Sequence, residues 1–77
     1  MNYHLDSADH LHQFAHRLMK TYLPSAWPGL VDTTLDRAYN HGLSAICEAT
    51  SNEDLHQARR ICRSIQRTIA RVNQSGN

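Results

Sequence analysis

Residues 52–73 read NEDLHQARRICRSIQRTIARVN, and their apolar side chains recur at alternating steps of three and four residues. This spacing places the apolar side chains along one stripe of an α-helix, as in the a and d positions of a heptad repeat. Because the stripe is shorter than three heptads, we expect it to pack inside a helical bundle or at a short dimer interface. Its members are Leu55, Ala58, Cys62, Ile65, Ile69 and Val72.

Two earlier segments also have the periodicity of amphipathic helices. Residues 7–23 form the first, which Asp6 or Ser7 would cap and Pro24 would end. Its apolar stripe comprises Leu11, Phe14, Ala15, Leu18 and Tyr22. Residues 31–49 form the second, whose apolar stripe comprises Val31, Leu35, Ala38, Tyr39, Gly42, Ile46 and Ala49.

Gly42 is the weak point of the second segment, since a glycine can end one helix and precede another. We expect one continuous helix, because the apolar period runs through the glycine. The small residues that would let a neighbouring helix approach closely are Ala38, Gly42, Ala45 and Ala49. A cap is predicted at Asp32, and another at Ser51, where Asp54 would complete a capping box before the third helix.

The composition indicates a small all-α protein. The chain has 77 residues, so we expect one domain over residues 1–77, which buries only ~60–65 % of the surface that the unfolded chain exposes. Three glycines and two prolines are too few for the many turns of an all-β domain. We therefore predict a three-helix bundle with a frayed tail at residues 74–77. Because the core is small, a helical homodimer is the alternative, joined through leftover apolar side chains such as Met19, Leu43 and Ile61.

The cysteines and the N-terminus indicate a reducing compartment. Cys47 and Cys62 are too few for a disulfide framework, and Cys62 lies on the apolar stripe, where we expect it in the core. The first residues are polar and acidic, unlike a signal peptide. No apolar run approaches the ~18 residues that cross a membrane. We expect a cytoplasmic protein with no membrane partner and no cofactor.

The charges are segregated along the chain. Residues 1–54 contain three basic and all seven acidic residues, whereas residues 55–77 contain five basic residues and no acid. The net charge of +1 therefore conceals a dipolar chain. The five basic side chains lie opposite the apolar stripe of the third helix or beside it, and no acid between them can neutralise them within the helix. We call them the arginine row: Arg59, Arg60, Arg63, Arg67 and Arg71.

Three interpretations of the arginine row are open. It can be an ordinary solvated helix face, because arginine forms helices well. It can also dock on the carboxylates of an acidic protein or follow the phosphates of a nucleic acid. We favour a protein over a nucleic acid, because the net charge is only +1 and residues 52–73 lack aromatic side chains that stack on bases. The sequence thus predicts a regulator, adaptor or inhibitor that binds a protein, with a nucleic-acid-binding regulator as the alternative.

Trp27 lies in a linker between the first two helices, among two prolines and a glycine. We expect it to fold back over the end of the bundle. The alternative is an exposed anchor for a partner, because tryptophan is frequent in binding hot spots.

Six histidines are many for 77 residues, and two of them share a helical flank with an acid. Asp9, His12 and His16 are spaced i, i+3 and i+7, which makes them a weak candidate for a zinc site. The two histidines have the spacing of a zinc-protease helix, but Gln13 replaces the essential glutamate. We expect surface histidines rather than a metal site, with a response to pH as a further interpretation.

The sequence contains no recognisable catalytic constellation. It has neither a glycine-rich phosphate loop nor a nucleophile elbow, and a small bundle offers little concavity for a substrate. A cysteine–histidine pair could attack a substrate in principle, but the sequence indicates no third group to orient the histidine. We therefore do not expect an enzyme.

Overall fold

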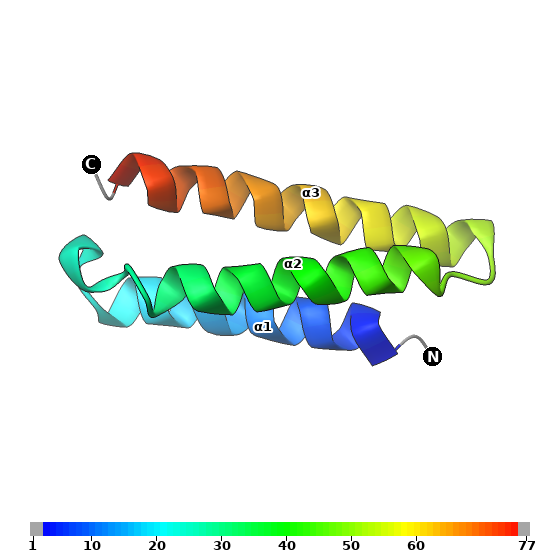
Figure 1. Ribbon diagram of the computed structural model, residues 1–77, viewed down its shortest axis with the longest axis horizontal. Helices are drawn as coiled ribbons and strands as arrows, with labels where there is room; N and C mark the ends of the chain where they lie inside the picture. The colour runs from blue at the N-terminus through cyan, green and yellow to red at the C-terminus, as the bar shows by residue number, and fades with distance from the viewer. Residues whose placement is uncertain (1–2, 76–77) are drawn as a thin grey trace.

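The computed structural model describes residues 3–75 as an all-α bundle (Figure 1). Helix α1 spans Tyr3–Thr21, α2 spans Val31–Cys47 and α3 spans Asn52–Ser75, with a short 3₁₀ turn, η1, at Pro24–Ala26. Successive helices run in opposite directions in a bundle of 41 × 18 × 16 Å. Helix α2 packs closely against both neighbours, whereas α1 and α3 contact each other least. The predicted three-helix bundle is confirmed, and residues 3–75 contain no strand.

Helix α1 begins earlier than predicted. It starts at Tyr3, so Asp6 and Ser7 lie inside the helix and the cap predicted at either residue is wrong. Asp6 still complements the helix dipole, because it lies in the first turn. At the other end the helix stops at Thr21, shortly before Pro24 opens the 3₁₀ turn.

The cap predicted for α2 is wrong, whereas the cap predicted for α3 is confirmed. Leu30 precedes α2 without a side-chain cap, and the Asp32 carboxylate accepts a 2.9 Å hydrogen bond from the Thr33 N–H inside the first turn. Before α3, the Ser51 hydroxyl accepts a 3.1 Å hydrogen bond from the Asp54 N–H. Ser51 thus satisfies one of the N–H groups that a helix start leaves unpaired.

The two later helices also end elsewhere than predicted. Helix α2 ends at Cys47, two residues before the expected end at residue 49. Helix α3 continues to Ser75, so it extends into the tail that was expected to fray from residue 74. The rest of that predicted tail, residues 76–77, lies outside the described residues.

Helix α2 passes through Gly42 without a break, as predicted. Gly42 is buried where α3 packs on α2, and a Cβ atom placed on it would lie 2.6 Å from Cys62 Sγ. A contact this short does not fit a side chain, so glycine permits the close approach of the two helices.

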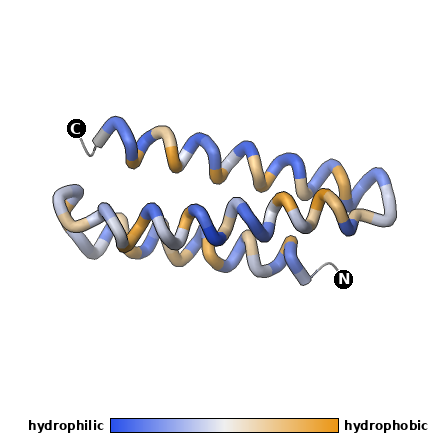
Figure 2. Tube along the Cα trace, in the orientation of Figure 1, coloured by the Kyte–Doolittle hydropathy of each residue, from blue (hydrophilic) through white to orange (hydrophobic). Residues whose placement is uncertain are grey.

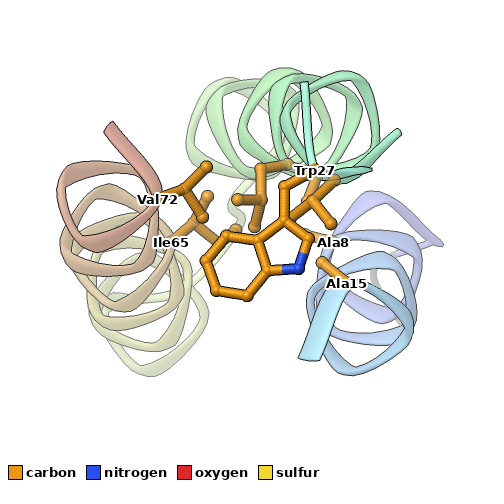
Figure 3. Packing of buried hydrophobic residues seen from close by; sticks show 8 residues of the cluster. Ala8, Ala15, Trp27, Ile65 and Val72 are labelled. Atoms are coloured by element: carbon orange, nitrogen blue, oxygen red, sulfur yellow. The ribbon is translucent and has the colours of Figure 1, made fainter. Parts of the chain in front are cut away.

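The apolar stripe of α3 forms one wall of the core, as predicted. Ala58, Cys62, Ile65 and Val72 are buried. The hydrophobic residues of α3 recur along the helix and lie toward α2, and its hydrophilic residues lie on the outer side (Figure 2). Buried side chains from all three helices meet in the middle of the bundle (Figure 3). The largest fully buried side chains are Leu35, Ile65 and Val31.

The apolar stripe predicted on α1 is partly wrong. Its fully buried positions are Ala8 and Ala15, whereas Phe14 and Tyr22 are each 47 % exposed. Phe14 is the neighbour of Ala15 and therefore lies about 100° around the helix from it. The closely packed face of α1 is centred on small alanines, and this turns Phe14 toward its edge, whereas Tyr22 lies just past the end of α1 at Thr21.

Trp27 is buried, so the alternative of an exposed partner-binding anchor is wrong and the predicted folding back is confirmed. Its side chain is 9 % exposed and lies in the core at the end where α1 joins α2 (Figure 3). The indole N–H donates a 3.0 Å hydrogen bond to the backbone carbonyl of Tyr22. That carbonyl follows the last turn of α1, where carbonyls lack intrahelical donors, so one bond satisfies both polar groups.

Candidate functional site

All five side chains of the arginine row are exposed on α3. From Arg59 to Arg71 the row spans ~18 Å, at the usual rise of about 1.5 Å per helical residue. None of the five arginines forms an ion pair with another residue among residues 3–75. Their charges therefore face solvent, as the sequence pattern predicted.

Two grooves flank α3, the helix that bears the arginine row. The groove between α1 and α3 has a volume of about 410 Å³, and its lining includes Asp6 and Asp9 of α1 and Arg60 of α3. The groove between α2 and α3 has a volume of about 210 Å³, and its lining includes Asp32 and Asp36. Each side of α3 thus has a groove with two carboxylates in its lining, and Arg60 is the member of the row that lines one of these grooves.

A polar cluster joins α1 to α3 beside the first groove. His12 Nε2 lies 2.8 Å from Thr68 Oγ1 and 3.2 Å from His16 Nε2. Thr68 is only 4 % exposed, and its hydroxyl donates a 3.1 Å hydrogen bond to the Ser64 carbonyl. Burial lowers the pKa of His12, the neighbouring His16 imidazole lowers it further, and the Asp9 carboxylate opposes both effects. The cluster therefore favours a neutral His12.

The structure does not assemble the weak metal candidate. His12 and His16 meet, but the Asp9 carboxylate accepts a 3.0 Å hydrogen bond from the side-chain amide of Gln13. No group of three or more His, Cys, Asp or Glu side chains in the described part of the chain is placed to hold a metal ion.

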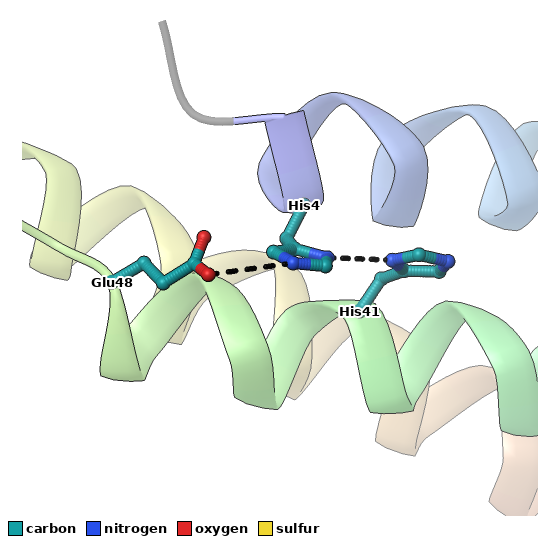
Figure 4. A network of polar contacts seen from close by, with 3 residues as sticks. All are labelled: His4, His41 and Glu48. Carbon is teal, nitrogen blue, oxygen red and sulfur yellow. Dashed lines mark hydrogen bonds and ion pairs between the residues drawn. The ribbon is translucent and has the colours of Figure 1, made fainter.

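A second histidine pair joins α1 to α2 near the other end of the bundle. His4 Nδ1 lies 2.9 Å from His41 Nδ1, and His4 Nε2 lies 3.6 Å from Glu48 Oε1 (Figure 4). The Tyr3 ring meets both imidazoles edge-on, at centroid distances of 5.3 and 6.1 Å. This cluster was not predicted, because its members are distant in sequence and meet only where the start of α1 packs beside the end of α2.

Both cysteines are free thiols. Cys62 is buried in the core, as predicted, and burial raises the pKa of its thiol. Cys47 is exposed. The two cysteines do not form a disulfide with each other.

The apolar side chains proposed for a dimer interface differ in exposure. Met19 and Ile61 are partly buried against the core, whereas Leu43 is 42 % exposed. Two of the three side chains thus already have packing partners within the bundle. The homodimer stays a prediction.

Comparison of the chain with known protein families, curated proteins and solved structures found no match. Among residues 3–75, none of the helices combines the length and the apolar character that crossing a lipid bilayer requires. The function of the protein is therefore inferred from the positions of its side chains.

Proposed function

We propose that the protein is a small regulator, adaptor or inhibitor that binds an acidic surface of another protein through the arginine row. The observation that supports this function is the row itself, five exposed guanidinium groups on one helix without an ion pair among residues 3–75. Guanidinium groups bind carboxylates through paired hydrogen bonds, which gives such a surface geometric specificity as well as affinity.

The carboxylates beside the row favour a protein over a nucleic acid. Asp6 and Asp9 line the groove on one side, and Asp32 and Asp36 line the groove on the other. A nucleic acid carries phosphates along its whole backbone, so a duplex lying on α3 would bring some of them toward these carboxylates. A protein partner can place acids against the row and neutral or basic groups against its borders. Helix α3 also has no phenylalanine, tyrosine or tryptophan on which bases could stack.

The row would act first on the rate of association. Exposed charges of one sign steer a complementary surface into encounter, and salt screens this attraction. Once the partner is bound, the same groups would form charge-assisted hydrogen bonds that slow dissociation. The two free thiols are compatible with a reducing compartment such as the cytoplasm.

Reversing the charge of two arginines in the middle of the row tests this function. Arg63→Glu combined with Arg67→Glu changes the net charge by −4, because each substitution replaces +1 by −1. Both positions are exposed, so the helix content should stay unchanged in circular dichroism. We expect capture of the partner from native lysate to fall about tenfold or more.

The matched control reverses two exposed cations of α1, Arg17→Glu and Lys20→Glu, with the same change in net charge. Capture by this variant should stay close to that of the wild type. Equal loss in both double variants would point to net charge alone, and undiminished capture by the α3 variant would eliminate the arginine row as the binding surface.

A further inference from the structure

A third groove lies between α1 and α2 and is larger than the two grooves beside α3. None of the five arginines of the row lines it. It has a volume of about 630 Å³. Its polar and aromatic lining comes from one face of the first half of α1 and from the middle of α2. The side chains that matter below are Tyr3, Asp6, Ser7, His10, Arg37 and His41.

Four of these polar groups have no side-chain partner in the described part of the chain. Asp6, Ser7, His10 and Arg37 make neither a side-chain hydrogen bond nor an ion pair with any of residues 3–75. Asp6 and Arg37 have opposite charges and line the same groove, yet they do not pair. A few polar groups that converge on a concave surface and remain uncommitted are typical of a small-molecule site.

His41 differs from these groups because a second helix orients it. Its Nδ1 atom faces His4 Nδ1 at 2.9 Å, and the opposite nitrogen of His4 faces Glu48 Oε1 at 3.6 Å (Figure 4). When His4 has a proton on both ring nitrogens, its Nε2–H faces the Glu48 carboxylate and its Nδ1–H can donate a hydrogen bond to His41 Nδ1. The proton of His41 is then on Nε2, which can donate to a ligand. The Nε2 atom of His41 lies on the side of the ring away from His4 and is left for a ligand.

We propose that the groove between α1 and α2 binds a small phosphate ester. Arg37, His10 and His41 would hold the phosphate group, and Asp6 and Ser7 would bind hydroxyl or amino groups on the body of the ligand. The proposal does not depend on the arginine row, because none of the five arginines lines this groove, although Asp6 lines both this groove and the one between α1 and α3.

A phosphate fits these groups better than a carboxylate does. Its oxygens are arranged tetrahedrally, so it can take donors that arrive from two helices, whereas a carboxylate takes its donors in one plane. The guanidinium group of Arg37 provides a permanent positive charge, and each imidazole can donate one hydrogen bond from a ring nitrogen. The Asp6 carboxylate beside them would weaken the binding of a bare anion and favour a ligand that also has hydrogen-bond donors.

An NMR titration of the full chain tests the proposal with defined probes. Inorganic phosphate, ribose 5-phosphate and acetate are added separately, and the ring protons of the six histidines are followed. We expect saturable shifts of His10 and His41 with ribose 5-phosphate, weaker binding of inorganic phosphate and no saturation with acetate. Shifts that do not saturate with either phosphate, or that occur only at residues of α3, would overturn the proposal.

Two matched pairs of variants locate the site. Arg37→Gln should weaken ribose 5-phosphate binding about tenfold, because a charge-assisted hydrogen bond is lost, whereas Arg17→Gln on the exposed face of α1 should not. His41→Gln should weaken binding similarly, whereas His56→Gln on the exposed face of α3 should not. Equal weakening within either pair would contradict the assignment. Arg37 is exposed, so its substitution should leave the fold intact even if replacement of His41 does not.

Discussion

At position 42, α2 has only a hydrogen atom where any other residue would have a Cβ atom, and Cys62 Sγ fills that space. A Cβ atom there would lie 2.6 Å from the sulfur. Two effects therefore oppose each other on substitution by alanine. Alanine favours a helix over glycine by ~0.8–1 kcal/mol, whereas overpacking of a close contact typically costs ~1–3 kcal/mol. We expect the overpacking to dominate, because Cys62 is short and enclosed.

A double-mutant cycle separates the two effects. Gly42→Ala alone should lower the free energy of unfolding by ~1 kcal/mol. In the Cys62→Ala background the sulfur is absent, so the same substitution should raise the free energy of unfolding by ~0.5–1 kcal/mol. Urea unfolding of the four proteins, followed by circular dichroism, measures both values. The same sign in both backgrounds would show that Cys62 does not limit the approach of the helices.

The pKa of His12 makes the stability of the bundle depend on pH. Burial and the neighbouring His16 imidazole lower this pKa in the folded state from its ordinary value of 6.5. As the pH falls through 6.5, the unfolded chain binds a proton at His12 before the folded chain does. The free energy of unfolding should therefore decrease below this pH, and the decrease should stop once the pH lies below the folded-state pKa.

Replacement of His12 should remove this contribution. The difference in unfolding free energy between wild type and His12→Gln should shrink as the pH falls from 7.5 to 5. Only the wild type has the stabilising contribution of His12, so only the wild type loses it. His56→Gln is the control for the loss of an imidazole, since His56 is exposed on α3 and lies outside the cluster of His12, His16 and Thr68. A difference between wild type and His12→Gln that stays constant over this range would refute the role of His12.

At the scale of the elements, α3 could be predicted from sequence better than α1. The alternating steps of three and four residues on α3 match a straight helix packed along one side, and its stripe is the wall of the core. On α1 the aromatic residues suggested a buried face that the structure places elsewhere. Phe14 is half exposed because the closely packed face is centred on Ala8 and Ala15, and such small residues give only a weak hydropathy signal.

The polar contacts between elements could not be predicted from local spacing. Thr68 is buried although it is polar, because its hydroxyl has partners on α1 and α3. The contact of His4 with Glu48 requires knowledge of which helix ends meet. The five arginines, in contrast, were placed correctly, since their position follows from the period of α3 alone.

The linker between α1 and α2 contributes a core residue, and its removal should cost more than removal of an exposed aromatic side chain. Trp27→Ala should lower the free energy of unfolding by ~3–5 kcal/mol, and Phe14→Ala by less than about 1 kcal/mol. The decrease for Trp27→Phe should lie between these two values. Phenylalanine keeps an aromatic ring in the core but loses the hydrogen bond of the indole N–H to the Tyr22 carbonyl. Urea unfolding of the three variants measures this order. A cost for Phe14→Ala as large as that for Trp27→Ala would contradict the described core.

At the scale of the whole molecule, the fold changes the meaning of the charge segregation along the chain. Asp6 and Asp9 of α1 line the same groove as Arg60 of α3, although they lie far apart in sequence. Four of the seven acids, Asp6, Asp9, Asp32 and Asp36, line the two grooves beside α3. The exposed arginines of α3 thus share the surface of the bundle with these acids, and the proposed partner would need a charge pattern that matches both rather than a uniform negative charge.

The nature of that partner is tested most directly by capture from native lysate with the wild-type chain, with and without nuclease and at two salt concentrations. The double variant Arg63→Glu and Arg67→Glu is the negative control for non-specific capture, and mass spectrometry identifies the captured proteins. We predict that one acidic protein is captured by the wild type alone, survives nuclease, and is lost only gradually as salt increases. Capture that disappears with nuclease and falls steeply with salt would show that the arginine row binds phosphates instead.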